Sequence, residues 1–204
     1  MQEIKETSYR ISLRDKILDA ALKSFVENGI RAVKMDDIAT MLSISKRTLY
    51  ELYKDKEEVV FQSITKYYKK RREDRKAYAE NHNVMDIILY SYSQEAKESQ
   101  NVSLQLYIDI QKYPRIVSYL EENHRQAREN LRQFLLRGVE EGYFRKDINY
   151  DLLPNLFDAI EQHIQKMELY RNYSFRELFS NMLLIPLRGF CTEKGLKVLD
   201  KAEF

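Results

Sequence analysis

Apolar residues recur at intervals of three and four positions along nearly the whole 204-residue chain, and little interrupts them. This spacing gathers side chains on one face of an α-helix, whereas a half-buried strand needs strict alternation. The chain has only five glycines and three prolines, the residues that most often end helices and form turns. The sequence therefore predicts an all-α fold.

The stop signals divide this pattern into helices. Pro154 must lie in a first turn, the Ser174 and Glu177 pair is typical of a capping box, and Pro186 should bend the helix that contains it. Two short helices are expected between residues 35 and 53. Longer helices are expected at residues 12–28, 55–79, 84–99, 101–112 and 115–141, with one starting between 149 and 151 and a last one over 174–194.

The two short helices are separated by a tight polar turn. Asp36 and Asp37 lie in the first turn of the first helix, where the helix dipole favours carboxylates. Ser45 is placed to cap the second helix, and Leu49 faces inward. This arrangement is typical of a helix-turn-helix, in which the leading end of the second helix meets the major groove of DNA.

The segment from about residue 13 to 64 resembles the DNA-binding domain of TetR-family transcriptional regulators. The motifs that carry the resemblance, in order, are Asn28-Gly29, Ile38-Ala39, Ser45-Lys46-Arg47-Thr48-Leu49-Tyr50, Tyr53 and Lys56-Glu57. Three positions depart from the family pattern. Ser43 stands where a turn glycine is usual, Arg47 where a small residue is common, and Lys34 where a threonine usually caps the second helix.

The predicted function is sequence-specific binding of double-stranded operator DNA. Net charge is only +2, so attraction to phosphate must come from a local patch. We expect phosphate contacts from Lys34, Tyr50 and Lys56. Base contacts are expected from the leading end of the second short helix: Ser45, Lys46, Arg47 and Thr48. Arg47 or Lys46 is the natural partner of a guanine edge. The alternative is that Lys46 and Arg47 are simply solvated charges on an exposed helix.

The expected organisation is an N-terminal helix-turn-helix three-helix DNA-binding domain at residues 1–54 and a C-terminal helical domain for effector binding and dimerisation at 55–204. No flexible linker separates them, so the helix over 55–79 would be shared. The resemblance implies a homodimer through the last two helices. Their apolar stripes are Leu153, Leu156, Ile160, Ile164 and Met167 in one, and Leu178, Met182, Ile185 and Phe190 in the other.

Aromatic residues on the central helices indicate either a ligand pocket or plain core. A mostly apolar cavity with a few hydroxyls suits a small hydrophobic or aromatic effector. The candidate lining residues are Tyr90, Tyr107, Tyr113, Phe134, Phe157 and His163. The prediction is thus a repressor released from its operator by such an effector. The alternative is a DNA-bound interaction or localisation protein, or a constitutive repressor without an effector.

Other classes of function find no support in the residues. Cys191 is the single cysteine, which excludes an intramolecular disulfide and fits a reducing cytoplasm. Residues 1–6 carry charges where a signal peptide needs an apolar run, and no later stretch is apolar enough to span a bilayer. Glycine-rich phosphate loops, metal-ligand spacings and nucleophile motifs are absent from the sequence. We therefore expect a cytoplasmic protein that is not an enzyme and has no cofactor or metal.

Overall fold

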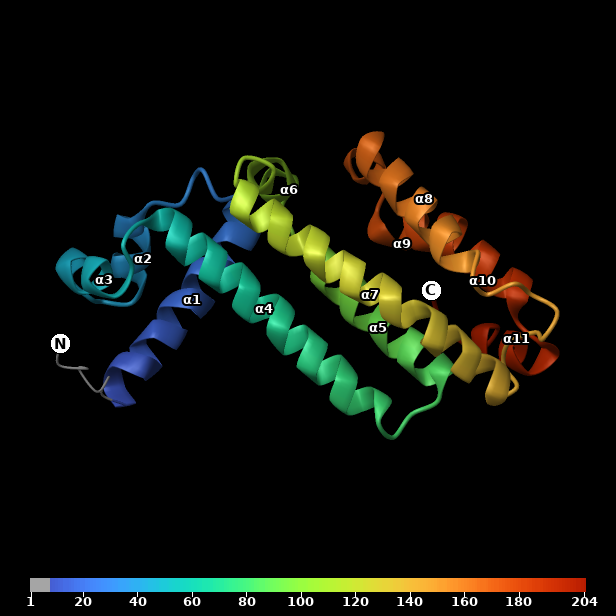
Figure 1. Ribbon diagram of the computed structural model, residues 1–204. Coiled ribbons are helices and arrows are strands. Elements are labelled where there is room, and N and C mark those ends of the chain that lie inside the picture. Colours follow the sequence, from blue (N-terminus) through green and yellow to red (C-terminus); the bar gives the residue numbers. More distant parts are fainter. Residues whose placement is uncertain (1–7) are drawn as a thin grey trace. The chain divides into compact units, whose positions relative to one another are not determined.

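The computed structural model describes residues 8–204, so the argument made above from residues 1–6 lies outside the described residues. Within this range the regular secondary structure is helical, and the chain forms two compact units (Figure 1). Unit 1 comprises the residues up to 72 together with 101–121, and unit 2 comprises 73–100 and 122–204. Two helices, α4 (Lys56–Ala79) and α7 (Pro114–Glu140), contribute residues to both units.

The remaining helices each belong to one unit. Those of unit 1 are α1 (Ser8–Asn28), α2 (Met35–Met41), α3 (Lys46–Leu52) and α6 (Leu104–Ile110). Those of unit 2 are α5 (Val84–Ser99), α8 (Leu153–Lys166), a 3₁₀ turn (Leu169–Arg171), α9 (Phe175–Leu178), a π-helical segment (Phe179–Leu183), α10 (Leu184–Phe190) and α11 (Glu193–Leu199). The all-α prediction is confirmed.

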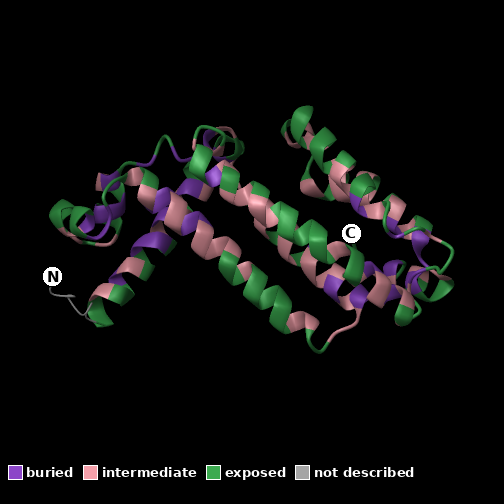
Figure 2. Ribbon diagram, viewed as in Figure 1, coloured by how far each residue is buried: buried purple, intermediate pink, exposed green. Residues whose placement is uncertain are grey.

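The core of unit 1 holds the helix-turn-helix in place. Phe25 of α1, Ile38 of α2 and Leu49 of α3 are fully buried in one cluster, which α4 completes with Val59 and Val60. The buried positions lie on the inner faces of these helices, with exposed residues on the opposite faces (Figure 2). Because the apolar face of each short helix is buried, the orientation of its polar face is fixed as well.

The compact unit that contains the helix-turn-helix extends well beyond residue 54, because α6 packs on α1. The Ser103 N–H donates to the Val26 carbonyl at 2.8 Å, and Leu106 lies in the core. Asp109, only 1% exposed, accepts the Arg31 N–H at 2.8 Å, the Gln105 amide at 2.9 Å and the Lys112 ammonium at 3.3 Å. This carboxylate ties α6 to the loop between α1 and α2.

Unit 2 has an aromatic core and a polar seam. Phe144 and Phe190 meet edge to face at 5.0 Å, and the Gly138 position leaves no room for a side chain because a Cβ there would lie 2.1 Å from the Phe144 ring. Polar and charged side chains link α7 to α8 and to the turn that precedes α8. The linking pairs are His124–Glu161 at 2.8 Å, Arg128–Asp158 at 2.6 Å and Arg132–Asp151.

Four predicted helices had wrong boundaries. The helix expected over 101–112 spans only Leu104–Ile110, because Ser103 caps its start and a turn follows Ile110. The first helix begins at Ser8 rather than Ser12, and the helix that contains Pro154 begins at Leu153 rather than between 149 and 151. The last predicted helix does open with the Ser174 capping box, but it ends at Phe190 and not near Lys194. There the Phe190 carbonyl accepts the Arg145 N–H at 2.9 Å, and Cys191 is extended. Thr192 then caps a separate helix, α11.

The distortion in that helix lies before the proline. Pro186 has no N–H to donate to the carbonyl four residues earlier, and the chain widens into the π-helical segment Phe179–Leu183. The expected bend near Pro186 thus takes the form of a widened turn that precedes it.

We predict that Asp109→Ala lowers the free energy of unfolding by about 2–3 kcal/mol at pH 7, because the Arg31 N–H and its neighbours lose a charged acceptor. Burial alone would raise the pKa of Asp109, but the Arg31, Gln105 and Lys112 donors hold it below its usual value. This contribution is therefore present above the unfolded pKa of about 4 and is lost as the pH falls through the lower folded value.

Urea unfolding followed by helix circular dichroism at pH 7 and at pH 3 tests this prediction. Asp109→Asn is the matched control, because it retains an acceptor for the Arg31 N–H and should cost about 1 kcal/mol. Equal stability of the parent and the alanine variant at pH 7 would contradict the role given to this carboxylate.

Candidate nucleic-acid interface

The turn between α2 and α3 has the hydrogen bonds of a Schellman motif. The Ile44 N–H donates to the Ala39 carbonyl and the Ser43 N–H to the Thr40 carbonyl, both at 3.0 Å. Ser43 takes the left-handed conformation that this motif requires, with φ of 53°. Serine thus supplies the positive φ at the position where the TetR-family pattern has glycine, at the cost of some backbone strain.

α3 begins with a capped and exposed first turn. The Ser45 hydroxyl accepts the Thr48 N–H at 3.0 Å and lies 2.8 Å from the Thr48 hydroxyl. Leu49 and Leu52 are buried, while Ser45, Lys46 and Arg47 are exposed and Thr48 is half-buried. The structure therefore gathers the four residues expected to read bases at one solvent-facing helix end.

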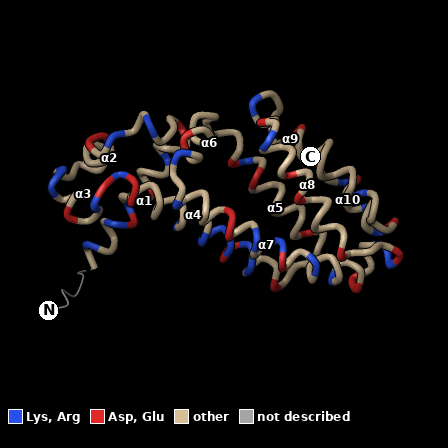
Figure 3. The backbone as a smooth tube through the Cα atoms, turned by 45° about the horizontal axis from the view of Figure 1, so that its top comes forward, with Lys and Arg blue, Asp and Glu red and all other residues tan. Residues whose placement is uncertain are grey.

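Both cations at this end are paired in the free protein. Lys46 forms an ion pair with Asp36 of α2, and the Arg47 guanidinium donates to the Glu51 carboxylate at 2.9 Å. Lys and Arg alternate with Asp and Glu along this part of the chain (Figure 3). Because all four side chains are largely solvent-exposed, these pairs are weak and can exchange for a base edge or a phosphate.

The three expected phosphate contacts lie around α3 in the same unit. Lys34 is exposed and precedes α2. Its backbone N–H donates to the Asp37 carboxylate at 2.7 Å, which is the reciprocal half of a capping box, while the Lys34 side chain caps no N–H of the helix. Tyr50 is 51% exposed. Lys56 is half-buried in the first turn of α4, and this burial lowers its pKa against the attraction of Asp109 and Asp37. The attraction of these two carboxylates favours a cation at this helix start even without a phosphate.

The six aromatic and histidine residues expected to line an effector pocket are divided between the two units. Tyr107 and Tyr113 belong to unit 1, where Tyr113 packs against the core. Phe134 and Phe157 pack against the core of unit 2, Tyr90 stacks on Tyr78 at 4.1 Å, and His163 is exposed on α8. These positions suit the alternative reading of several of them as core.

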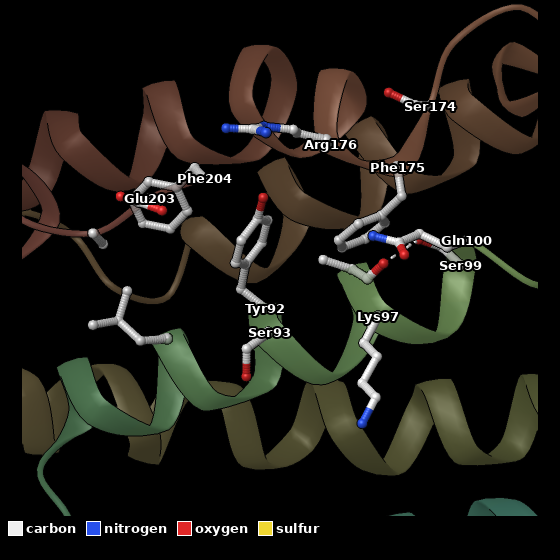
Figure 4. Close-up of a pocket in the computed structure, with 13 residues that line it drawn as sticks. Tyr92, Ser93, Lys97, Ser99, Gln100, Ser174, Phe175, Arg176, Glu203 and Phe204 are labelled. Carbon is white, nitrogen blue, oxygen red and sulfur yellow. Dashed lines mark hydrogen bonds between the residues drawn. The ribbon is translucent and has the colours of Figure 1, made fainter.

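A pocket of about 790 Å³ lies within unit 2, and none of the six residues lines it (Figure 4). Its walls come from α5, from the start of α9 and from residues 202–204. Tyr92, Phe175 and Phe204 supply aromatic surface, and Lys97, Arg176 and Glu203 supply charge. Nothing local in the sequence indicates that Phe175 and Phe204 meet Tyr92.

No group of three or more His, Cys, Asp or Glu side chains in residues 8–204 is arranged to hold a metal ion. None of the helices described is both long and apolar enough to cross a membrane.

In unit 1 a short helix and a tight turn precede a capped, cation-bearing helix, and these two helices are fixed on a three-helix core. This arrangement defines a helix-turn-helix DNA-binding protein. Comparison with known proteins agrees. Residues 17–62 match the family model described as bacterial regulatory proteins, tetR family. The chain is 31% identical over 152 residues to the HTH-type transcriptional repressor KstR2 of Mycobacterium tuberculosis, covering 70% of this chain and 74% of that protein.

Solved structures show the same fold. The chain is similar to the ketosteroid transcriptional regulator KstR2 of M. tuberculosis, with a TM-score of 0.51, 25% identity, and coverage of 89% of this chain and 96% of that one. A putative regulator from Saccharomonospora viridis, solved in complex with choline, gives a TM-score of 0.68 at 16% identity, covering 90% and 100%. The chain belongs to the TetR family of bacterial transcriptional regulators.

We predict that Arg47→Ala relaxes preference at one position of each half-site and costs about 1–3 kcal/mol on the best sequence, because a bidentate base contact is lost. Lys56→Ala should instead weaken binding to all DNA sequences alike and reduce the dependence of affinity on salt concentration. Binding to a panel of single-base operator variants at several salt concentrations separates the two effects.

Glu51→Gln provides the matched control for Arg47, since it removes the pairing carboxylate and leaves the guanidinium in place. This variant should bind DNA more tightly and keep the sequence preference, whereas Glu193→Gln, which changes the same charge on unit 2, should not. Indistinguishable profiles for Arg47→Ala and Lys56→Ala would refute the division into base and phosphate contacts.

Proposed function

We propose that the protein is a sequence-specific transcriptional repressor that binds operator DNA through α3 and leaves it when a small, largely hydrophobic effector binds. The exposed first turn of α3 carries this proposal, because it presents Ser45, Lys46 and Arg47 from a rigid, capped helix. The naming of the relative KstR2 as a transcriptional repressor supports this sign of regulation.

The proposed active form is a homodimer that buries α8 and α10 against a second copy. Large apolar side chains on these two helices face solvent in the single chain, and Ile185 is the extreme case at 61% exposed. Leu156 on α8 is exposed as well. Phe190, expected in the same stripe, is buried within its own chain, so the proposed interface excludes it. A dimer would hold two recognition helices about 34–36 Å apart, one duplex turn.

We predict that replacing both Leu156 and Ile185 by Glu gives a monomer, because two charges would be buried in an apolar interface. Light scattering at micromolar concentration measures the mass. Leu104→Glu, at an exposed apolar position on α6, is the control that should leave the mass unchanged. A parent chain that is monomeric in this measurement would sink the dimer.

We retain residues 1–54 as the DNA-binding segment and 55–204 as the effector-binding and dimerisation segment of this proposal. The helix α4 contributes to both compact units, which supports a mechanical route between them. An effector that prefers one arrangement of the units would change operator affinity through this helix. Couplings of this kind amount to about 1–3 kcal/mol, which is severalfold to about a hundredfold in affinity.

Thermodynamic reciprocity provides the test. If an effector weakens operator binding by a given factor, operator DNA must weaken effector binding by the same factor. We therefore expect a ligand identified by its thermal stabilisation of the protein to bind more weakly when saturating operator DNA is present. Equal affinities with and without operator would replace the ligand-released repressor by the constitutive repressor or the DNA-bound interaction protein.

A further inference from the structure

Serine hydroxyls line part of the pocket of unit 2. Three serines line it, and each already donates its hydroxyl hydrogen within the protein: Ser93 to the Tyr90 carbonyl at 2.8 Å, Ser99 to the Ala96 carbonyl at 3.1 Å and Ser174 to the Glu177 carboxylate at 2.7 Å. These hydroxyls are therefore not the groups that would donate to a ligand.

Tyr92 is the polar group best placed to do so. Its side chain is 9% exposed, and its ring packs 5.0 Å from Phe204 and 5.9 Å from Phe175. Among residues 8–204 its hydroxyl has no hydrogen-bond partner, although a buried tyrosine O–H normally has one. The ring is thus held by aromatic neighbours while its hydroxyl end borders the cavity.

The charge beside this hydroxyl is positive. Figure 4 shows the Tyr92 hydroxyl turned toward the Arg176 side chain, whereas Lys97 points away from the rings. In the described part of the chain no ion pair engages Arg176, and Glu203 is the single side-chain carboxylate among the lining residues. The solvent-exposed Arg176 guanidinium and the Tyr92 hydroxyl line the same pocket, and together they match the two oxygens of a carboxylate.

We propose that this pocket binds a small apolar acid, with its ring system packed against the aromatic surface of Tyr92, Phe175 and Phe204 and its carboxylate held by Arg176 and the Tyr92 hydroxyl. A volume of about 790 Å³ lies within the range of pockets for such molecules. The inference deepens the proposed function by naming the chemical class of the effector, and its binding step is measured without DNA.

The experiment is a calorimetric titration of the full chain with 2-naphthoate and with 2-acetylnaphthalene, a neutral ketone of nearly the same size. We expect the acid to bind about tenfold more tightly than the ketone, as a charge-assisted hydrogen bond in a partly buried site would give. Choline, a cation, is titrated in the same way. The proposal is overturned if naphthoate does not bind at millimolar concentration, if the acid and the ketone bind equally well, or if choline binds more tightly than naphthoate.

Variants locate the contact. Arg176→Gln should weaken naphthoate binding about threefold or more and leave ketone binding unchanged, and Arg176→Lys should recover part of the loss. Tyr92→Phe keeps the ring but removes the hydroxyl, so it should weaken naphthoate binding about tenfold. Glu203→Gln should strengthen naphthoate, because it removes a like charge from the wall. Lys146→Gln, an exposed lysine that does not line the pocket, is the control for net charge. A preference for the acid over the ketone that is as large in Arg176→Gln as in the parent chain would contradict the assignment.

Operator binding in the presence of naphthoate separates this inference from the proposed function. Naphthoate binding that follows the variant pattern supports the ligand class whether or not the operator is released. Binding with that pattern and with unchanged operator affinity would remove the effector role alone.

Discussion

The packing of two short helices against α1 is the constraint on which the rest of the protein depends. Neither α2 nor α3 is long enough to be stable alone, so both rely on the burial of Ile38 and Leu49 in the core of unit 1. The Schellman turn at Ser43 sets the angle between them, and the Ser45 cap starts α3 at a defined residue. With its inner face buried, α3 exposes its cationic leading end, Tyr50 and Glu51 to solvent.

Charge in this protein is arranged locally rather than globally. The chain as a whole is nearly neutral, and Lys46 and Arg47 each lie beside a carboxylate. Any anionic partner of these two cations would compete with Asp36 and Glu51, and both pairs are weak because they are exposed. The buried carboxylate of Asp109 has a structural role instead. It joins α6 to the loop before α2 and so connects the helix-turn-helix to a helix far away in sequence.

Local signals predicted most of the fold. The Ser45 and Ser174 caps and the stop at Gly29 each lie next to the helix end that they set, and these three helix ends were predicted correctly. Prediction failed where distant segments decide the outcome. The helix through Pro186 ends at Phe190 because the Arg145 N–H takes its carbonyl, and Tyr92 meets Phe175 and Phe204 across more than 80 residues of chain. No periodicity within one helix contains that information.

The central claim is that α3 reads a specific DNA sequence from a symmetric pair of chains. Selection of a random duplex library by the purified full chain, followed by sequencing of the bound fraction, tests it most directly. The account predicts a two-fold symmetric motif whose half-sites are centred about 10 base pairs apart, or a multiple of one duplex turn. A bound fraction without an enriched motif, or a single asymmetric motif bound by a monomer, would contradict it.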